Sequence, residues 1–185
     1  YTPTPLGSHT PAAIESIGKT RTKDENGPQG LTAALTGGAS AMCYTSEDVM
    51  AATFNVDLIN DVGRCIGEDC LAMGYSGLYG PGINMHRTAY SGRNFEYYAS
   101  DPFVAGTICA AEVNGIQSKG VYVYLKHVAL NDSESSRRGV NTWLNEQAAR
   151  EIYLEVADKA ITDGGAWSVM SGFNRWGATW CGAYD

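Results

Sequence analysis

Residues 121–130 read VYVYLKHVAL, an apolar run of β-branched and aromatic residues that turns polar only at Lys126 and His127. This composition predicts a buried strand. Gly120 precedes the run, and a polar segment, NDSESSRRG (131–139), follows it. We therefore expect a helix to end at Gly120 and a loop to begin where the strand ends.

Helical and strand patterns alternate along the rest of the chain. Apolar residues recur at helical spacing between Val56 and Met73 and again after Asn145, whereas short apolar runs predict strands. Residues 13–42 leave room for one earlier strand. The predicted helices cover 45–54, 55–74, 102–119 and 146–165, and the predicted strands cover 75–84, 121–130 and 166–173.

This order of elements predicts an α/β fold in which βα units surround a parallel sheet. A closed (β/α)8 barrel takes about 250 residues. The 185 residues of this chain therefore fit about half of a TIM-type barrel. Ser46 is expected to cap the first helix, and Ser100 or Asp101, followed by Pro102, is expected to cap the third.

The composition argues against several classes of protein. With 44% hydrophobic and 18% charged residues, the chain can form one globular core. Thirteen basic and 20 acidic residues give a net charge of −7, which disfavours a nucleic-acid partner. No apolar run is long enough to cross a membrane, so no membrane partner is expected. The absence of a Gly-rich phosphate loop and of a G-x-S-x-G motif disfavours a P-loop protein and a serine acyl-transfer enzyme.

Neither the cysteines nor the histidines have the spacing of metal ligands, so no metal or other cofactor is expected. The helical positions of Cys65, Cys70 and Cys109 favour buried thiols. Unpaired cysteines favour a reducing compartment such as the cytoplasm over secretion, although the compartment stays open on this evidence.

Polar side chains follow each of the three predicted strands. The segment MHRTAYSGRNFEYY (85–98) follows the first, Lys126, His127 and 131–139 follow the second, and 170–174 follow the third. Because the carboxyl ends of parallel strands meet at one edge of a sheet or barrel, we expect these groups to form one site.

Each candidate has a structural as well as a functional interpretation. Arg87 and Arg93 either lie in solvent or direct their donors at ligand hydroxyls or at a carboxylate. A buried Lys126 needs a partner, which is either a salt bridge beside a core His127 or a polar ligand pocket.

The loop after the central strand and the nearby aromatic residues leave similar alternatives. The charged residues of 131–139 either pair with one another, or Glu134 orients the site. The aromatic residues either belong to the core or form a platform for a sugar ring: Tyr90, Phe95, Tyr97, Tyr98, Trp143, Phe173, Trp176 and Trp180.

Four blocks together resemble glycoside hydrolase family 3, in its β-glucosidase-like branch. The resemblance runs from about Gly27 to Trp180. The blocks are GPGINMHRTAYSGRNFEYYASDPFVAG (80–106), KHVALNDSESSRRG (126–139), LNEQAAREIYL (144–154) and WSVMSGFNRWGATW (167–180).

The resemblance implies a (β/α)8-type first domain, usually followed by an α/β sandwich domain. It implies retaining hydrolysis of terminal, non-reducing β-D-glucosyl residues by two carboxyl groups. The composition of residues 1–26, rich in Thr, Pro, Gly and Lys, predicts an irregular N-terminal segment. The resemblance implies that 27–185 are the N-terminal part of the barrel domain, truncated before the nucleophile strand. The expected partners are a β-glucoside or oligosaccharide substrate, the remainder of the barrel and the sandwich domain.

The resemblance also implies roles for particular residues. Arg93, Lys126 and His127 would hydrogen-bond the sugar in the innermost subsite, and Met170 would line the same pocket. Phe173 stands where the family often has a tyrosine near the nucleophile, so one hydroxyl that could bond that carboxylate is lost.

Asn26 stands where the family has an aspartate that binds sugar hydroxyls. An amide offers one acceptor and two donors in place of two charged acceptors, so sugar affinity should fall unless Asp24 or Glu25 substitutes.

No residue of this chain is assigned as catalytic. The family's nucleophile lies in a Ser/Thr-Asp-Trp/Tyr segment one strand further on, and its acid/base usually comes from the later domain. Asp185 has the wrong context for either role. The chain alone is therefore expected to show no turnover of an aryl β-glucoside. The alternative is a non-catalytic carbohydrate-binding or structural fragment derived from such an enzyme.

Overall fold

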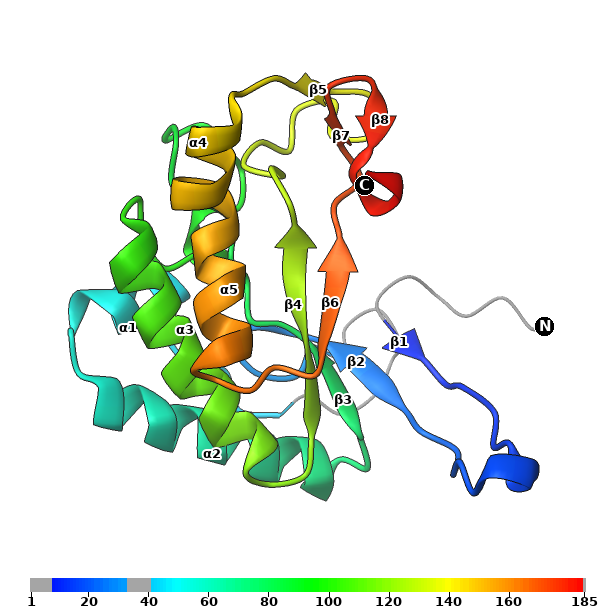
Figure 1. Ribbon diagram of the computed structural model, residues 1–185. Helices are drawn as coiled ribbons and strands as arrows, with labels where there is room; N and C mark the ends of the chain where they lie inside the picture. The colour runs from blue at the N-terminus through cyan, green and yellow to red at the C-terminus, as the bar shows by residue number, and fades with distance from the viewer. Residues whose placement is uncertain (1–7, 33–40, 185) are drawn as a thin grey trace.

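The computed structural model describes residues 8–32 and 41–184. Its main sheet has the strand order β1-β2-β3-β4-β6, in which β1 is antiparallel to β2 and the other neighbours are parallel (Figure 1). The strands are β1 (Ser8–His9), β2 (Asp24–Asn26), β3 (Gly77–Tyr79), β4 (Tyr122–Val128) and β6 (Ser168–Ser171). The predicted parallel βα units are therefore present.

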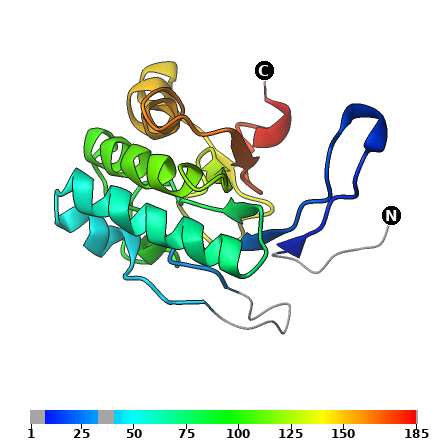
Figure 2. The same cartoon turned by 90° about the horizontal axis from the view of Figure 1, so that it is seen from below.

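The long helices pack together on one face of this sheet (Figures 1 and 2). Leu78, Val123 and Leu125 point from the strands into the core, where they are fully buried. The helices are α1 (Glu47–Ala52), α2 (Val56–Ala72), α3 (Pro102–Gln117), α4 (Glu146–Ala148), the π-helical η4 (Ala149–Leu154) and α5 (Glu155–Thr162).

Side-chain caps fix the starts of three of these helices. Asn55 accepts a hydrogen bond from the backbone of α2, Asp101 caps α3 ahead of Pro102, and Asn145 caps α4. Ser46 stands at the N-cap position of α1 as predicted, but its hydroxyl donates to the Asp48 carboxylate and makes no cap hydrogen bond to the backbone.

The structure corrects several predicted elements. Residues 1–26 were expected to be irregular, but they contain β1, the short helix η1 (Glu15–Ile17) and β2. Strand β2 is the earlier strand for which 13–42 left room. The predicted strand 75–84 is reduced to the three residues of β3. Cys70 and Cys109 are buried as expected, whereas Cys65 is exposed.

A second, small sheet was not predicted. It consists of β5 (Asn141–Thr142), β7 (Arg175–Trp176) and β8 (Thr179–Trp180), with β5 parallel to β7 and β7 antiparallel to β8. This sheet lies beyond the C-terminal ends of β4 and β6 (Figure 1). None of the described helices combines the length and apolarity that crossing a bilayer requires.

The face of the main sheet opposite the long helices carries a polar column. Tyr122 and Tyr124 donate hydrogen bonds to the two carboxylate oxygens of Asp24. Gly77 allows this close approach, because a Cβ there would lie 2.2 Å from the Tyr122 ring. Two residues further along β2 and β4, the same alternation brings Asn26 and Lys126 to this face.

Candidate functional site

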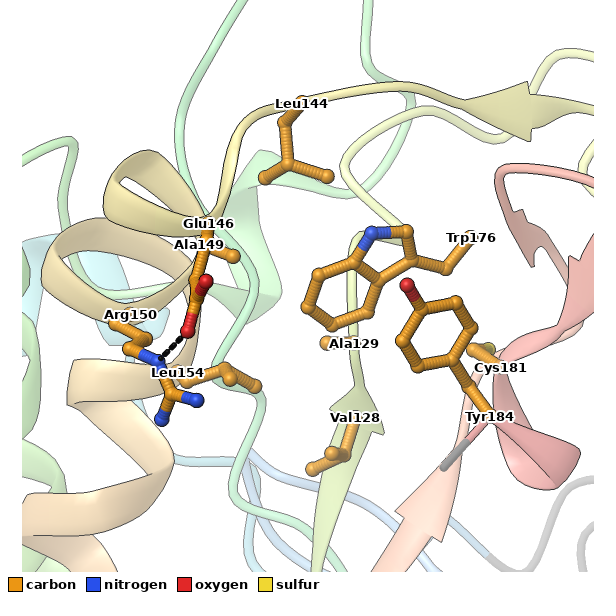
Figure 3. Close-up of a pocket in the computed structure, with 10 residues that line it drawn as sticks. All are labelled: Val128, Ala129, Leu144, Glu146, Ala149, Arg150, Leu154, Trp176, Cys181 and Tyr184. Atoms are coloured by element: carbon orange, nitrogen blue, oxygen red, sulfur yellow. Dashed lines mark hydrogen bonds and ion pairs between the residues drawn. The ribbon is translucent and has the colours of Figure 1, made fainter.

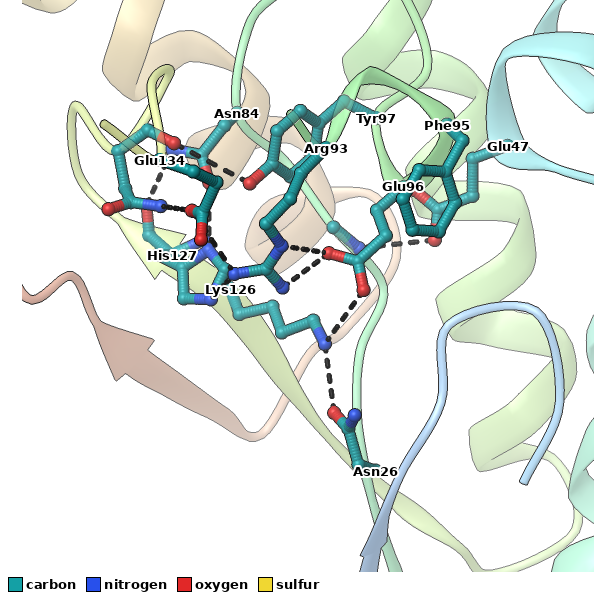
Figure 4. Close-up of polar contacts among 12 residues, drawn as sticks. Asn26, Glu47, Asn84, Arg93, Phe95, Glu96, Tyr97, Lys126, His127 and Glu134 are labelled. Atoms are coloured by element: carbon teal, nitrogen blue, oxygen red, sulfur yellow. Dashed lines mark hydrogen bonds and ion pairs between the residues drawn. The ribbon is translucent and has the colours of Figure 1, made fainter. Parts of the chain in front are cut away.

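Lys126 joins two segments that are distant in the sequence. Its ammonium lies 3.0 Å from the Asn26 amide oxygen, to which it donates, and 3.6 Å from one Glu96 carboxylate oxygen. Figure 4 shows Lys126 between these two residues, at the C-terminal ends of the strands. Burial lowers the pKa of Lys126, and the Glu96 charge opposes that shift.

Arg93 is held from three sides. Its Nε donates to Glu96 Oε2 at 2.6 Å, and its Nη1 lies 3.2 Å from His127 Nε2 and 3.5 Å from Glu134 Oε1. Glu96 therefore bridges Arg93 and Lys126. Arg93, Lys126, His127 and Asn26, predicted separately along the chain, belong to one connected network.

Asn84 fixes the orientation of the His127 ring. The Asn84 amide oxygen accepts from the His127 backbone N–H at 2.9 Å and lies 3.0 Å from ring Nδ1. Since that oxygen only accepts, Nδ1 carries the proton, and Nε2 accepts from Arg93. Burial lowers the pKa of His127 to about 2, and the charges of Arg93 and Lys126 act in the same direction. The imidazole is therefore neutral.

Neighbouring residues on a regular strand point to opposite faces, yet Lys126 and His127 meet the same network. The pairing of β4 with β6 shifts register between Lys126 and Val128, which interrupts the alternation at this point. Met170 pairs with Lys126 in that register. The strand end therefore places both polar side chains and Met170 at the rim of the sheet.

The loop 131–139 combines both of its predicted roles. Glu134 Oε2 accepts from Arg137 at 2.6 Å, and Oε1 accepts from Asn131 at 2.9 Å and from Arg93 at 3.5 Å. The loop thus pairs its own charges and also orients Arg93. Residues Glu134, Ser136, Arg137, Arg138 and Gly139 line an open hollow of about 480 Å³.

Phe173 contacts two arginines of this loop. The Arg137 guanidinium lies 4.7 Å from the centre of its ring, and Arg138 lies 5.7 Å from it. Phe173 therefore supports Arg137 through a cation–π contact. Arg137 itself was not assigned to the site from the sequence.

Arg87 and His86 do not join the network. Arg87 lies over the Tyr153 ring at 5.6 Å. His86 Nε2 lies 2.8 Å from each of two backbone carbonyls, those of Asn94 and Tyr97, so His86 holds the turn that precedes Glu96. Of the three basic residues in 85–98, Arg93 is the one that contacts β4, through His127.

Glu96 was missed by the sequence prediction, although a signal existed. Arg93 and Glu96 are three residues apart around the single turn of η3 (Asn94–Glu96), a spacing that allows an ion pair. A carboxylate at this spacing from a candidate arginine could have been assigned as its partner.

Neither Asp24 nor Glu25 takes the place of Asn26. The Asp24 oxygens accept from Tyr122 and Tyr124, and Glu25 is a buried residue that accepts from the Asn26 backbone and from the Tyr75 hydroxyl. The register change that would have offered a carboxylate at this position is therefore absent.

Behind the site, Glu47 supports the segment that follows β3. Its Oε1 accepts from the Gly82 backbone at 3.2 Å, and it is fully buried near Glu112, whose Oε2 accepts from Tyr98 at 2.7 Å. Burial raises the pKa of Glu112 to about 7 and, with the Glu112 charge, raises that of Glu47. This carboxyl pair favours its protonated form.

The predicted aromatic platform is divided between different places. Tyr97 and Tyr98 are core residues, whereas Tyr90 and Trp143 are largely exposed. Trp176 stacks on Tyr184 with ring centres 4.6 Å apart. This pair lines a hollow of about 500 Å³ between the small sheet and the helix that begins at α4 (Figure 3). None of Asn26, Arg93, Lys126 and His127 lines it, so this hollow is separate from the network.

The residues that the structure describes contain no cluster of three or more His, Cys, Asp or Glu side chains that could hold a metal ion. The chemistry available in the network is hydrogen-bond donation from buried, mutually oriented cationic groups.

The sequence profile of the glycosyl hydrolase family 3 N-terminal domain matches residues 28–183. The chain belongs to this family. It is 35% identical over 173 residues to a β-glucosidase of Rhizobium radiobacter, covering 92% of this chain and 21% of the relative. It is 34% identical over 176 residues to thermostable β-glucosidase B of Acetivibrio thermocellus, covering 91% of this chain and 23% of the relative.

The solved structure of β-glucosidase 3B from Thermotoga neapolitana in complex with glucose has the same fold, with a TM-score of 0.85 and 33% identity. That match covers 93% of this chain and 25% of the other. The predicted fold class is thereby confirmed: the family 3 chain forms part of a TIM-type (β/α)8 barrel. It spans a quarter or less of the length of these relatives (21%, 23% and 25%).

Proposed function

We propose that this family 3 chain supplies the sugar-binding half of a retaining glycoside hydrolase that removes terminal, non-reducing β-D-glucosyl residues. The observation that carries the proposal is the network of Asn26, Arg93, Lys126 and His127 at the C-terminal ends of adjacent parallel strands. Ligands of barrel enzymes bind at that end of the strands.

The described residues would bind and orient the sugar. Arg93 and Lys126 keep donors that are not used by Glu96, and these would bond to sugar hydroxyls. His127 uses Nδ1 on Asn84 and Nε2 on Arg93, so its first contribution would be to hold Arg93. Met170 would offer an apolar contact at the rim, and Phe173 would set the position of Arg137.

Retaining hydrolysis needs a nucleophile and an acid/base carboxyl group about 5 Å apart. We assign neither role to a residue of this chain. The carboxylates of the network, Glu96 and Glu134, are engaged by arginine, lysine and asparagine donors. Their proposed task is to position the cations.

The test uses the protein as its gene encodes it. The natural protein should release nitrophenol from 4-nitrophenyl β-glucoside, and NMR should detect the β-anomer of glucose as the first product. Arg93→Gln should lower kcat/KM at least ~100-fold, because a charge-assisted donor in a buried network is lost. Arg150→Gln is the matched control, since Arg150 is 71% exposed and pairs with Glu146 on the helix surface.

The two candidate functions give different results. Hydrolysis that is lost in Arg93→Gln but kept in Arg150→Gln supports the enzyme. Glucose binding without turnover would favour the alternative, a non-catalytic carbohydrate-binding protein. Unchanged hydrolysis in Arg93→Gln would contradict the assignment of the network to the sugar.

A further inference from the structure

The orientation of the Asn26 amide follows from its neighbour. Lys126 Nζ lies 3.0 Å from Asn26 Oδ1, and an ammonium group has donors only. The amide oxygen must therefore face Lys126, and the amide nitrogen must face away from it. The Asn26 backbone is held on both sides, because its N–H donates to Glu25 Oε1 at 2.9 Å and its C=O accepts from Thr32 at 2.8 Å.

The Asn26 nitrogen is available to a ligand. The residue is partly exposed, and its Nδ2 has no hydrogen-bond partner among the residues that the structure describes. Two N–H donors thus stand on a partly exposed residue whose amide oxygen binds the Lys126 ammonium. The amide oxygen is directed to Lys126, so the unpaired group of Asn26 is a donor.

The acceptors of the surrounding network are directed to protein donors. Glu96 places one oxygen on Arg93 and the other beside Lys126. Both oxygens of Glu134 accept from protein donors, and both ring nitrogens of His127 are engaged. The partly exposed, unpaired polar atom at this cluster is therefore a donor, Asn26 Nδ2, whereas the unpaired acceptor Asn131 Oδ1 is buried.

The charge of the cluster points the same way. Arg93, Lys126 and Arg137 carry three positive charges, Glu96 and Glu134 carry two negative ones, and His127 is neutral. Within this ion-paired group one positive charge is in excess, in a chain whose net charge is −7. The Asp24 carboxylate, two residues before Asn26, lies outside the group and is bonded to Tyr122 and Tyr124. Donors with excess positive charge favour a ligand group that accepts hydrogen bonds and is negatively charged.

We propose that Asn26 is a specificity-determining residue that directs this site to a sugar bearing a carboxylate, a hexuronic acid, in preference to the neutral hexose. The carboxylate accepts from Asn26 Nδ2 and from Lys126. This inference rests on the proposed function to the extent that the cluster holds a sugar, and it names the class of that sugar. An aspartate at position 26 would present a negative charge to the ligand's carboxylate and would reverse the preference.

The test compares two ligands on the protein as its gene encodes it. Calorimetry should find that D-glucuronate binds at least ~10-fold more tightly than D-glucose, because charge-assisted hydrogen bonds are about twice as strong as neutral ones. Raising the salt concentration should weaken the binding of glucuronate and leave that of glucose unchanged. Equal affinities, tighter binding of glucose or no binding of glucuronate would overturn the inference.

Variants identify the residue responsible. Asn26→Asp should lower glucuronate affinity roughly 10- to 100-fold through like-charge repulsion and make glucose the better ligand. If the aspartate variant does not fold, Asn26→Ala is the substitute test. It adds no charge and should remove most of the preference for glucuronate over glucose. Asn141→Asp makes the same chemical change at an exposed position and should alter neither affinity. An unchanged ratio in a folded Asn26→Asp variant would overturn the assignment.

The failure of this inference and the failure of the proposed function are distinguishable. Hydrolysis of 4-nitrophenyl β-glucoside without a preference for glucuronate removes the inference and leaves the function. A preference for glucuronate without turnover of the β-glucoside or the β-glucuronide removes the function and leaves the inference.

Discussion

Glu96→Gln tests whether one buried carboxylate organises the site. The Glu96 side chain is 9% exposed and lies between Arg93, which is 17% exposed, and Lys126, which is 2% exposed. Glutamine keeps the shape and one acceptor but removes the charge. Breaking a buried pair by removing one partner costs about 3 to 5 kcal/mol. Because one acceptor remains, we expect a loss of about 3 kcal/mol at pH 7, near the lower end of that range.

The pH dependence gives an independent check. Burial already lowers the pKa of Lys126 below its value in the unfolded chain, and Glu96 opposes that shift. Without Glu96 the folded pKa of Lys126 falls further, so between that pKa and 10.5 the unfolded state binds more protons than the folded state. The free energy of unfolding of the variant then rises with pH. Its difference from that of the natural protein should therefore shrink as the pH approaches 10.

The assay is urea denaturation at pH 7 and pH 9.5, followed by tryptophan fluorescence. Glu146→Gln is the matched control, because Glu146 is 79% exposed and pairs with Arg150 on a helix surface. The control should lose less than about 0.5 kcal/mol. A Glu96→Gln deficit as small as that of the control, or one that grows with pH, would refute the bridging role.

Three further predictions concern the surroundings of the site. Burial raises the pKa of Glu112 to about 7 from 4.5, so the free energy of unfolding falls as the pH rises from 4.5 to 7 and the buried carboxyl group ionises. Glu112→Gln should match the natural protein at pH 4 and exceed its free energy of unfolding by up to about 3 kcal/mol at pH 8, as measured by urea denaturation. Phe173→Ala removes the ring beneath Arg137 and should raise KM several-fold with little change in melting temperature, whereas Phe173→Tyr should retain the KM of the natural protein. Burial raises the pKa of the Cys70 thiol to about 12, so a thiol reagent at pH 8 should label the exposed Cys65 within minutes and leave Cys70 unmodified until the protein is denatured, as judged by peptide mass.

The elements that could be predicted are those whose signal is local. The run 121–130 gave strand β4, and Asp101 with Pro102 gave the start of α3, because composition and capping act within a few residues. Strand β2 reads as a polar turn, since its residues Asp24 and Glu25 are carboxylates. Both are fully buried because tyrosines of other segments pair with them. The sequence around β2 does not indicate that pairing, because the tyrosines come from segments distant in the chain.

The site, too, could be predicted only in part. Arg93, Lys126 and His127 could be assigned to one site from the rule that functional residues follow the C-terminal ends of parallel strands. The direction of the Asn26 amide could not, because it is set by an ammonium group 100 residues away in the sequence. The second sheet was missed because its two-residue strands carry no periodicity from which a strand could be inferred.

The side chains of β4 alternate between the two faces of the sheet, and this alternation determines both the core and the site. Val123 and Leu125 point to the helices and are fully buried, whereas Tyr122 and Tyr124 point to the other face and bind Asp24. Lys126 continues that second series and meets Asn26, which lies two residues beyond Asp24 on β2. A one-residue slip of β4 would exchange the faces, so that a lysine entered the core while valine and leucine met the polar column. The burial that fixes the register therefore also fixes the position of the Lys126 ammonium, and the binding site needs no separate device to place it.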